Sequence, residues 1–209
     1  MTEFLCFLSD IKWGSILSPM ASIFTAYIAL KALNVWKTQK KTEICTKFLD
    51  DLTDEIHSLI NTLQPSIEFF TYVKIAIQSR EINSEIGDGL IEYINSCGDS
   101  DSAKLAEYLQ PCQSHVSRIR SLSAKGQTLG LSDYSECMSV CSKLCNEYDR
   151  LLSLRIILAM KNTNWKLPES NRALKAVMAN DPILIREAIA EINTTYLNFV
   201  SKSYSKFYN

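Results

Sequence analysis

Three cysteines that recur every fourth residue are the first candidates for chemistry in this sequence. Cys137, Cys141 and Cys145 would share one face of a helix, where thiols can bind a soft metal or sense oxidation. Two thiols one helical turn apart do not readily form a strain-free disulfide, and no CxxC spacing accompanies them. Because cysteine also packs well as a small buried residue, we expect these thiols to lie in a hydrophobic core, with a thiol or metal sensor as the alternative.

The other titratable residues limit the enzymatic interpretations. No Ser or Cys lies in a nucleophile signature, and the sequence has neither a glycine-rich phosphate loop nor an HExxH motif. His57 lies among acidic residues and is expected on a solvated helix face, while His115 is expected to hydrogen-bond in a loop. The carboxylate pairs Asp50–Asp51 and Asp54–Glu55 would point around a helix surface. We therefore expect no enzyme activity, no catalytic residue, no bound metal and no cofactor.

Charge and cysteine content exclude two further classes of protein. Residues 1–41 hold five Lys/Arg and two Asp/Glu, a net charge of +3, which leaves 17 and 21, a net charge of −4, for the rest of the 209 residues. A duplex-binding domain needs clustered Lys/Arg to neutralise phosphates, so direct nucleic-acid binding is not expected. The seven cysteines are an odd number without the pattern of a secreted disulfide scaffold, which favours a reducing compartment.

An uncharged stretch near the N-terminus would position the rest of the chain. The 18 residues from Trp13 to Leu30 carry no charged side chain, and as a helix they would be about 27 Å long, close to one bilayer core. Tryptophans near both ends of the stretch and lysines after the second tryptophan are typical of a membrane interface. The predicted anchor and interface residues are Trp13, Trp36, Lys37, Lys40 and Lys41.

A cleavable signal peptide and a buried core helix are the alternatives to a membrane anchor. The positive charges follow the apolar run instead of preceding it, which argues against a signal peptide. A buried core helix stays open because 18 residues is near the lower limit for spanning a bilayer. Serines, a proline and a threonine also make the stretch less apolar than a typical single span. Four of these polar residues step by three and four, so they would form one face that packs against other spans or lines a polar path. They are Ser15, Ser18, Ser22 and Thr25.

Helical periodicity continues beyond the anchor. Apolar residues recur in steps of three and four up to about residue 63, the pattern of a heptad seam with acidic residues on the opposite face. Pro65 is expected to end this helix because proline cannot continue the hydrogen-bond ladder. The seam would meet either a second chain in an oligomer or the chain's own bundle. Its residues are Leu49, Leu52, Ile56, Leu59 and Leu63.

The remaining patterns predict an all-α protein, because no segment shows the period of two that a half-buried strand needs. Helices are expected over about residues 65–79, 88–96, 101–110, 116–122, 132–161 and 182–203, with a short one that ends at Met178. The apolar segment Leu151–Met160 and the aromatic tail from Tyr196 fit the bundle core better than a membrane surface. We expect a short non-cytoplasmic tail (1–12), a transmembrane helix (13–36) and a cytoplasmic helical bundle (37–209).

The run YIALKALNVWKTQKK, residues 27–41, looks like the membrane exit of small bacterial proteins in which a short anchor precedes a helical cytoplasmic domain. By size, anchor and helical body the whole chain resembles the transmembrane effector of a bacterial retron. A retron is an anti-phage module that contains a reverse transcriptase and its RNA–DNA hybrid product. The resemblance covers about 15 residues of motif. It carries over no catalytic residue, because such effectors act without one.

The resemblance implies an abortive-infection mechanism at the bacterial inner membrane. A complex of the reverse transcriptase with its RNA–DNA hybrid would hold the effector inactive. Release of the effector, when a phage disables a host enzyme, would then perturb the lipid bilayer, so that the infected cell dies or stops growing. Independently of the resemblance, we expect a homo-oligomer that assembles through the seam Leu49–Leu63. The alternative is a membrane-tethered helical adaptor, which would bind a partner beside the membrane without any toxic activity.

Overall fold

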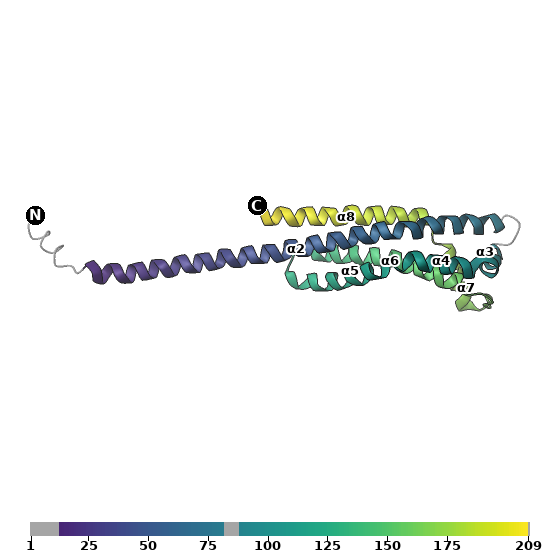
Figure 1. Ribbon diagram of the computed structural model, residues 1–209, viewed down its shortest axis with the longest axis horizontal. Coiled ribbons are helices and arrows are strands. Elements are labelled where there is room, and N and C mark those ends of the chain that lie inside the picture. The colour runs from purple at the N-terminus through teal and green to yellow at the C-terminus, as the bar shows by residue number, and fades with distance from the viewer. Residues whose placement is uncertain (1–12, 82–87, 209) are drawn as a thin grey trace, which may run out of the picture. The chain divides into compact units, whose positions relative to one another are not determined.

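The computed structural model describes residues 13–81 and 88–208, and every element in these two ranges is helical (Figure 1). The all-α class predicted from the sequence is therefore confirmed. The expected tail 1–12 lies outside the described residues. In chain order the elements are α2 (Trp13–Glu81), α3 (Asp88–Tyr93), the π-helix η1 (Ile94–Gly98), α4 (Asp99–Leu109), α5 (Cys112–Gly126), the 3₁₀-helix η2 (Gln127–Leu129), α6 (Tyr134–Leu158), α7 (Pro168–Met178) and α8 (Pro182–Tyr208).

The chain divides into two compact units, unit 1 (Met1–Thr46) and unit 2 (Lys47–Asn209). The described part of unit 1 is a single stretch of α2, which runs without a break through residues 34–42. Among the described residues, no helix combines the length and the apolar character that crossing a bilayer requires. The transmembrane helix expected over residues 13–36 thus has no support from the fold.

Helix α6 is the central element of unit 2, because it contacts α4, α5, α7 and α8. Its buried stripe includes Leu144, Leu151 and Leu154, which follow the 3.6-residue period of one helix face. Among the described residues, the core that these side chains share with the other helices contains 38 buried residues, and they form one continuous cluster. Two of the largest fully buried side chains, Tyr196 and Phe199, come from α8.

Pro65 does not end the first helix, and the expectation that it would was wrong. Helix α2 continues through Pro65 to Glu81. Pro65 itself is exposed, so the carbonyl that lacks its helical N–H partner can be satisfied by water. Three apolar residues on the next turns, Ile67, Phe70 and Val73, are buried in the same core as Leu63. We infer that burying these side chains outweighs the cost of one missing hydrogen bond.

The two apolar segments that could lie either in the bundle core or at a membrane surface both contribute to the bundle core. In Leu151–Met160, the side chains of Leu151, Leu154, Ile157 and Leu158 are buried. In the C-terminal helix α8, Tyr196 is fully buried and Phe207 packs against the core. The hydroxyl of Tyr204 also donates a hydrogen bond to the Asp50 carboxylate on α2. The buried side chains of both segments therefore belong to the core of the bundle.

Candidate functional site

From residue 19 to residue 41, the side chains of α2 are uncovered on every side of the helix. Each described side chain from residue 19 to residue 41 is exposed, although many are large and apolar. Ile23 is 71% exposed, Phe24 64% and Trp36 59%. A helix that displays such residues without a protein partner presents the kind of surface that lipid or another helix normally covers.

The predicted anchor residues lie along this exposed helix. Lys37, Lys40 and Lys41 are exposed, and the Lys40 ammonium lies 2.8 Å from the Glu43 carboxylate. On the predicted polar face, the Thr25 hydroxyl donates to the Ala21 carbonyl at 2.9 Å. This bond satisfies the hydroxyl within its own helix, which lowers the cost of placing it in an apolar environment.

Three other predicted residues, Trp13, Ser15 and Ser18, lie in the helical part of α2, but the structure describes only their backbone. The fourth polar-face position, Ser22, is exposed.

The heptad seam lies inside unit 2. Leu49, Leu52, Ile56, Leu59 and Leu63 each have an exposed fraction of 0%. At one end of the seam, the Tyr196 hydroxyl lies 3.0 Å from the Thr53 hydroxyl, which ties α8 to α2. In this arrangement the seam has no free surface for a second chain. The seam therefore builds the bundle of its own chain.

The cysteine stripe on α6 also lies in this core, as expected. Cys137, Cys141 and Cys145 are all buried. A hydrogen bond to Cys141 together with burial raises the pKa of Cys137, and burial raises the pKa of Cys145 to about 11. A protonated thiol is a poor nucleophile and a poor metal ligand. Within the described ranges, no group of three or more His, Cys, Asp or Glu side chains is arranged to hold a metal ion.

Glu55 joins two basic residues of α5, an arrangement that the sequence analysis missed. The Glu55 carboxylate lies 2.8 Å from His115 Nδ1 and 2.9 Å from Arg118 Nε, and the Glu55 side chain is only 16% exposed. The solvated position expected for Glu55 and the loop position expected for His115 were therefore wrong. The basic pair three residues apart on α5 was the available signal, because residues i and i+3 share one helix face.

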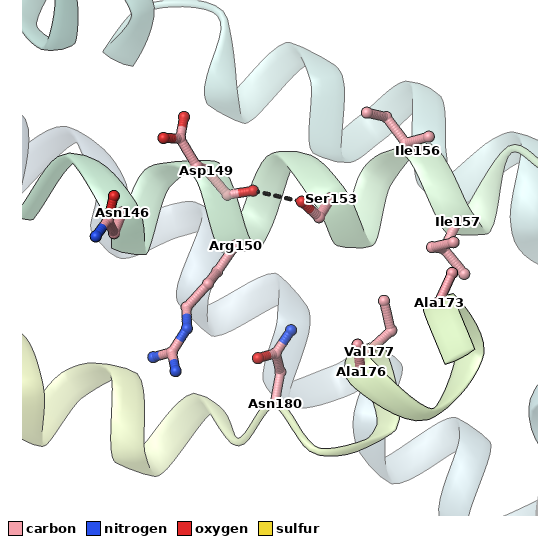
Figure 2. A pocket seen from close by; sticks show the side chains of 10 residues that line it. All are labelled: Asn146, Asp149, Arg150, Ser153, Ile156, Ile157, Ala173, Ala176, Val177 and Asn180. Atoms are coloured by element: carbon pink, nitrogen blue, oxygen red, sulfur yellow. Dashed lines mark hydrogen bonds between the residues drawn. The ribbon is translucent and has the colours of Figure 1, made fainter. Parts of the chain in front are cut away.

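A hollow on unit 2 lies beside the short helix α7 (Figure 2). Its volume is about 650 Å³, within the range of small-molecule sites. Helix α7 packs onto the bundle through Leu174 and Val177, which are buried, while the small side chains of Ala173 and Ala176 leave space toward α6. The lining residues are Asn146, Asp149, Arg150, Ser153, Ile156, Ile157, Ala173, Ala176, Val177 and Asn180. We call this hollow the α7 pocket.

The α7 pocket has a polar end and an apolar end. Figure 2 shows Arg150 and Asn180 on one side, apart from Ile157, Val177 and Ala173. Nη1 of Arg150 donates to both carboxylate oxygens of Glu147, at 3.1 and 3.0 Å. Asp149 is directed away from Arg150, and its carboxylate pairs with Arg120 at 2.8 Å.

The chemistry that this pocket offers is binding. Its one hydroxyl, on Ser153, donates to the main-chain carbonyl of Asp149 at 2.8 Å, so it is not held by a side-chain base. A nucleophile needs such a base or a lowered pKa before it can attack a substrate. An arginine beside an apolar wall instead supplies charge and burial for a ligand.

A lysine of α2 holds the loop that follows α7. The Lys74 ammonium of α2 donates to the Asn180 carbonyl at 3.0 Å and to the Asp181 carboxylate at 2.9 Å. The hydrogen bond from Lys74 lowers the pKa of Asp181 below its ordinary value. These bonds fix Asn180, and so they fix one wall of the pocket.

The sequence analysis did not predict the α7 pocket. The pairs Asn146 with Asp149 and Ala173 with Ala176 each share a helix face, but nothing local places α6 beside α7. Two small residues at a spacing of three in an amphipathic helix were the available signal, because they leave a shallow surface. Comparison of the chain with protein-family models, with curated proteins and with solved structures finds no match.

Proposed function

We propose that this chain is a membrane effector whose unit 1 inserts into a lipid bilayer and perturbs it. The observation that carries the proposal is the exposure of every described side chain from residue 19 to residue 41. Moving large apolar residues such as Ile23 and Phe24 out of water lowers the free energy by roughly 25 cal/mol per Å² of apolar surface buried. A bilayer covers all sides of such a helix at once.

Insertion is proposed to be collective, because hydroxyl side chains recur along one face of this helix and would be better satisfied by other copies than by lipid. The polar face formed by Ser15, Ser18, Ser22 and Thr25 would turn toward other copies, while Met20, Ile23 and Phe24 would face lipid. Small and hydroxyl residues let helices approach closely in a membrane, where interhelical hydrogen bonds satisfy their polar groups. A ring of such faces would also line a polar path across the bilayer.

The resemblance to retron effectors extends this proposal to antiviral defence. A reverse transcriptase bound to its RNA–DNA hybrid is the proposed inhibitory partner, and the bacterial inner membrane is the proposed target. A marginally apolar helix suits this regulation, since it gains little by inserting alone and more when several copies meet. Growth arrest after bilayer damage would then be the antiviral outcome.

The test is the membrane potential of bacteria after induced expression of the full chain. We expect rapid depolarisation with the full chain and none with residues 47–209 alone. The variant Ser18→Leu/Ser22→Leu removes half of the polar face and makes the helix more apolar, so it should remain membrane-bound while the depolarisation is lost. The matched control Thr194→Leu/Ser201→Leu changes two exposed positions on α8 and should depolarise like the parent. Depolarisation by the Ser18→Leu/Ser22→Leu variant would contradict the polar-path model.

A membrane-tethered adaptor is the second candidate, and the burial of the seam favours it. An effector that assembled through Leu49–Leu63 would need that surface free, yet unit 2 covers it completely. The adaptor predicts normal membrane potential and normal growth, together with one cytoplasmic protein that co-purifies with both the full chain and residues 47–209. The same expression experiment therefore separates the two candidates.

A further inference from the structure

We propose that the α7 pocket is a binding site for a small single-chain amphiphile with an anionic head group, a carboxylate or a phosphate monoester. This inference is independent of membrane insertion, because every residue that lines the pocket belongs to unit 2. It rests on three features of the pocket: its size, the separation of its polar and apolar ends, and the geometry of Arg150.

Arg150 supplies the anion-binding group at the polar end. A guanidinium has five N–H donors and remains charged at all physiological pH values. The bonds to Glu147 use Nη1, so the edge formed by Nε and Nη2 is left to pair with both oxygens of an acid. This geometry suits a carboxylate or phosphate better than a single acceptor. The Asn180 side chain lies on the same side of α6 and can add one hydrogen bond (Figure 2).

The acidic lining residue, Asp149, does not repel an anion at the polar end of the pocket. Asp149 extends from the far side of α6 in Figure 2, and its charge is paired with Arg120 at 2.8 Å. The acid that does touch Arg150, Glu147, is buried and neutralised by the same arginine. The second edge of the guanidinium is therefore the donor surface that an incoming anion meets.

The apolar end of the pocket fits a short hydrocarbon chain. Ile157 and Val177 are buried at its base, and Ala173 and Ala176 form a wall without bulk. A volume of about 650 Å³ is much larger than an anion alone needs, so a ligand that bound only Arg150 would leave the apolar surface wet. Each CH₂ group that is buried there should strengthen binding about fourfold.

Methyl NMR of the full chain in phosphatidylcholine nanodiscs tests the proposal directly. The methyl groups of Ile157 and Val177 report the apolar end, and octanoate, octyl phosphate and octanol are the probes. We expect saturable shifts with octanoate and octyl phosphate, and at least tenfold weaker binding of octanol. Equal affinity for octanol and octanoate, or no saturable shift with any probe, would overturn the proposal. Shifts of both methyl groups in phosphatidylglycerol nanodiscs without a probe would assign the pocket to a two-chain phosphodiester lipid, and would also overturn the proposal.

Two variants address the two ends of the pocket. Ala176→Phe fills the apolar end from an exposed position, and it should abolish binding of octanoate, whereas Ala190→Phe on the exposed face of α8 should not. Arg150→Gln should weaken octanoate at least tenfold and leave octanol unchanged, and Lys175→Gln is its control. The double variant Glu147→Gln/Arg150→Gln replaces the ion pair with an amide pair, in case loss of the arginine alone unfolds the chain. Unchanged octanoate affinity in Ala176→Phe would refute the site.

Discussion

At Gly98, close contact with the main chain of α6 leaves no room for a side chain. A Cβ atom at this position of η1 would lie 2.3 Å from the Leu158 main-chain oxygen at the end of α6. A backbone carbonyl cannot rotate away as a side chain can, so the helix must shift to make room. The glycine therefore sets how closely η1 approaches α6.

The variant Gly98→Ala should consequently destabilise unit 2. We expect a loss of about 1–3 kcal/mol in the free energy of unfolding, as for overpacked core positions. Urea unfolding followed by circular dichroism measures the change. Ser96→Ala, on the same π-helix but exposed, should stay within about 0.5 kcal/mol of the parent. A Gly98→Ala variant as stable as Ser96→Ala would mean that α6 and η1 are not in close contact.

The buried thiols should make the stability of the folded chain depend on pH above pH 9. Burial raises the pKa values of Cys112 and Cys145 from 9.0 to about 11 in each case. The raised folded-state pKa favours the protonated form, so the stabilisation is complete below pH 9 and is lost as the pH rises from 9 to 11. We expect a loss of the order of 2 kcal/mol for each thiol over this range.

Thermal unfolding between pH 8 and pH 11 measures this effect. Cys112→Ala removes one titrating group, so its stability should fall less steeply than that of the parent above pH 9. Among the cysteines of the described ranges, only Cys97 is less than fully buried, and iodoacetamide at pH 8 should modify it first. Labelling of Cys112 or Cys145 at the rate of Cys97 would show that the core opens.

At the scale of elements, local periodicity was sufficient to predict most helices. The spacing of apolar residues predicted a helix over about 132–161, and α6 spans Tyr134–Leu158. Pro182 and the residues after it likewise predicted α8. The expectation for Pro65 was wrong because proline's loss of a helical hydrogen bond is a local effect. The burial of Ile67 and Phe70, which outweighs it, depends on other helices. The spacing of the basic pair on α5 indicates a shared helix face, but the pairing of Glu55 with His115, 60 residues apart, depends on how the helices pack.

The seam supplies an element-scale prediction, because its burial in unit 2 does not involve a second chain. Ile56→Ala should lower the free energy of unfolding by about 2–5 kcal/mol, and Ile75→Ala, at a position that is 57% exposed, should change it by less than about 0.5 kcal/mol. Melting temperatures of residues 47–209 should not change with protein concentration. A strong concentration dependence that Ile56→Ala removes would instead place the seam between chains.

At the scale of the whole molecule, the two units differ in how much apolar surface they bury. Unit 2 buries its apolar residues in one core, and its hollow beside α7 arises from the way α7 lies on α6. No local pattern encodes that relation, so the pocket could not be predicted from the sequence. For unit 1 the sequence offers a local feature, an uncharged run followed by tryptophan and lysines, and the membrane anchor predicted from it stays a prediction. Its partner, lipid or protein, is a property of the surroundings that the sequence does not contain.

A single charge in unit 1 tests whether lipid is that partner. Ile23→Lys places a cation within the uncharged stretch, which in a bilayer costs about 2.5–3.5 kcal/mol, enough to lower membrane association more than tenfold. Ile75→Lys introduces the same charge at an exposed isoleucine of unit 2 and should have no effect on association. Flotation of the full chain with liposomes measures the bound fraction. If both variants float like the parent, unit 1 does not enter the bilayer, and its exposed apolar side chains instead cover another protein helix.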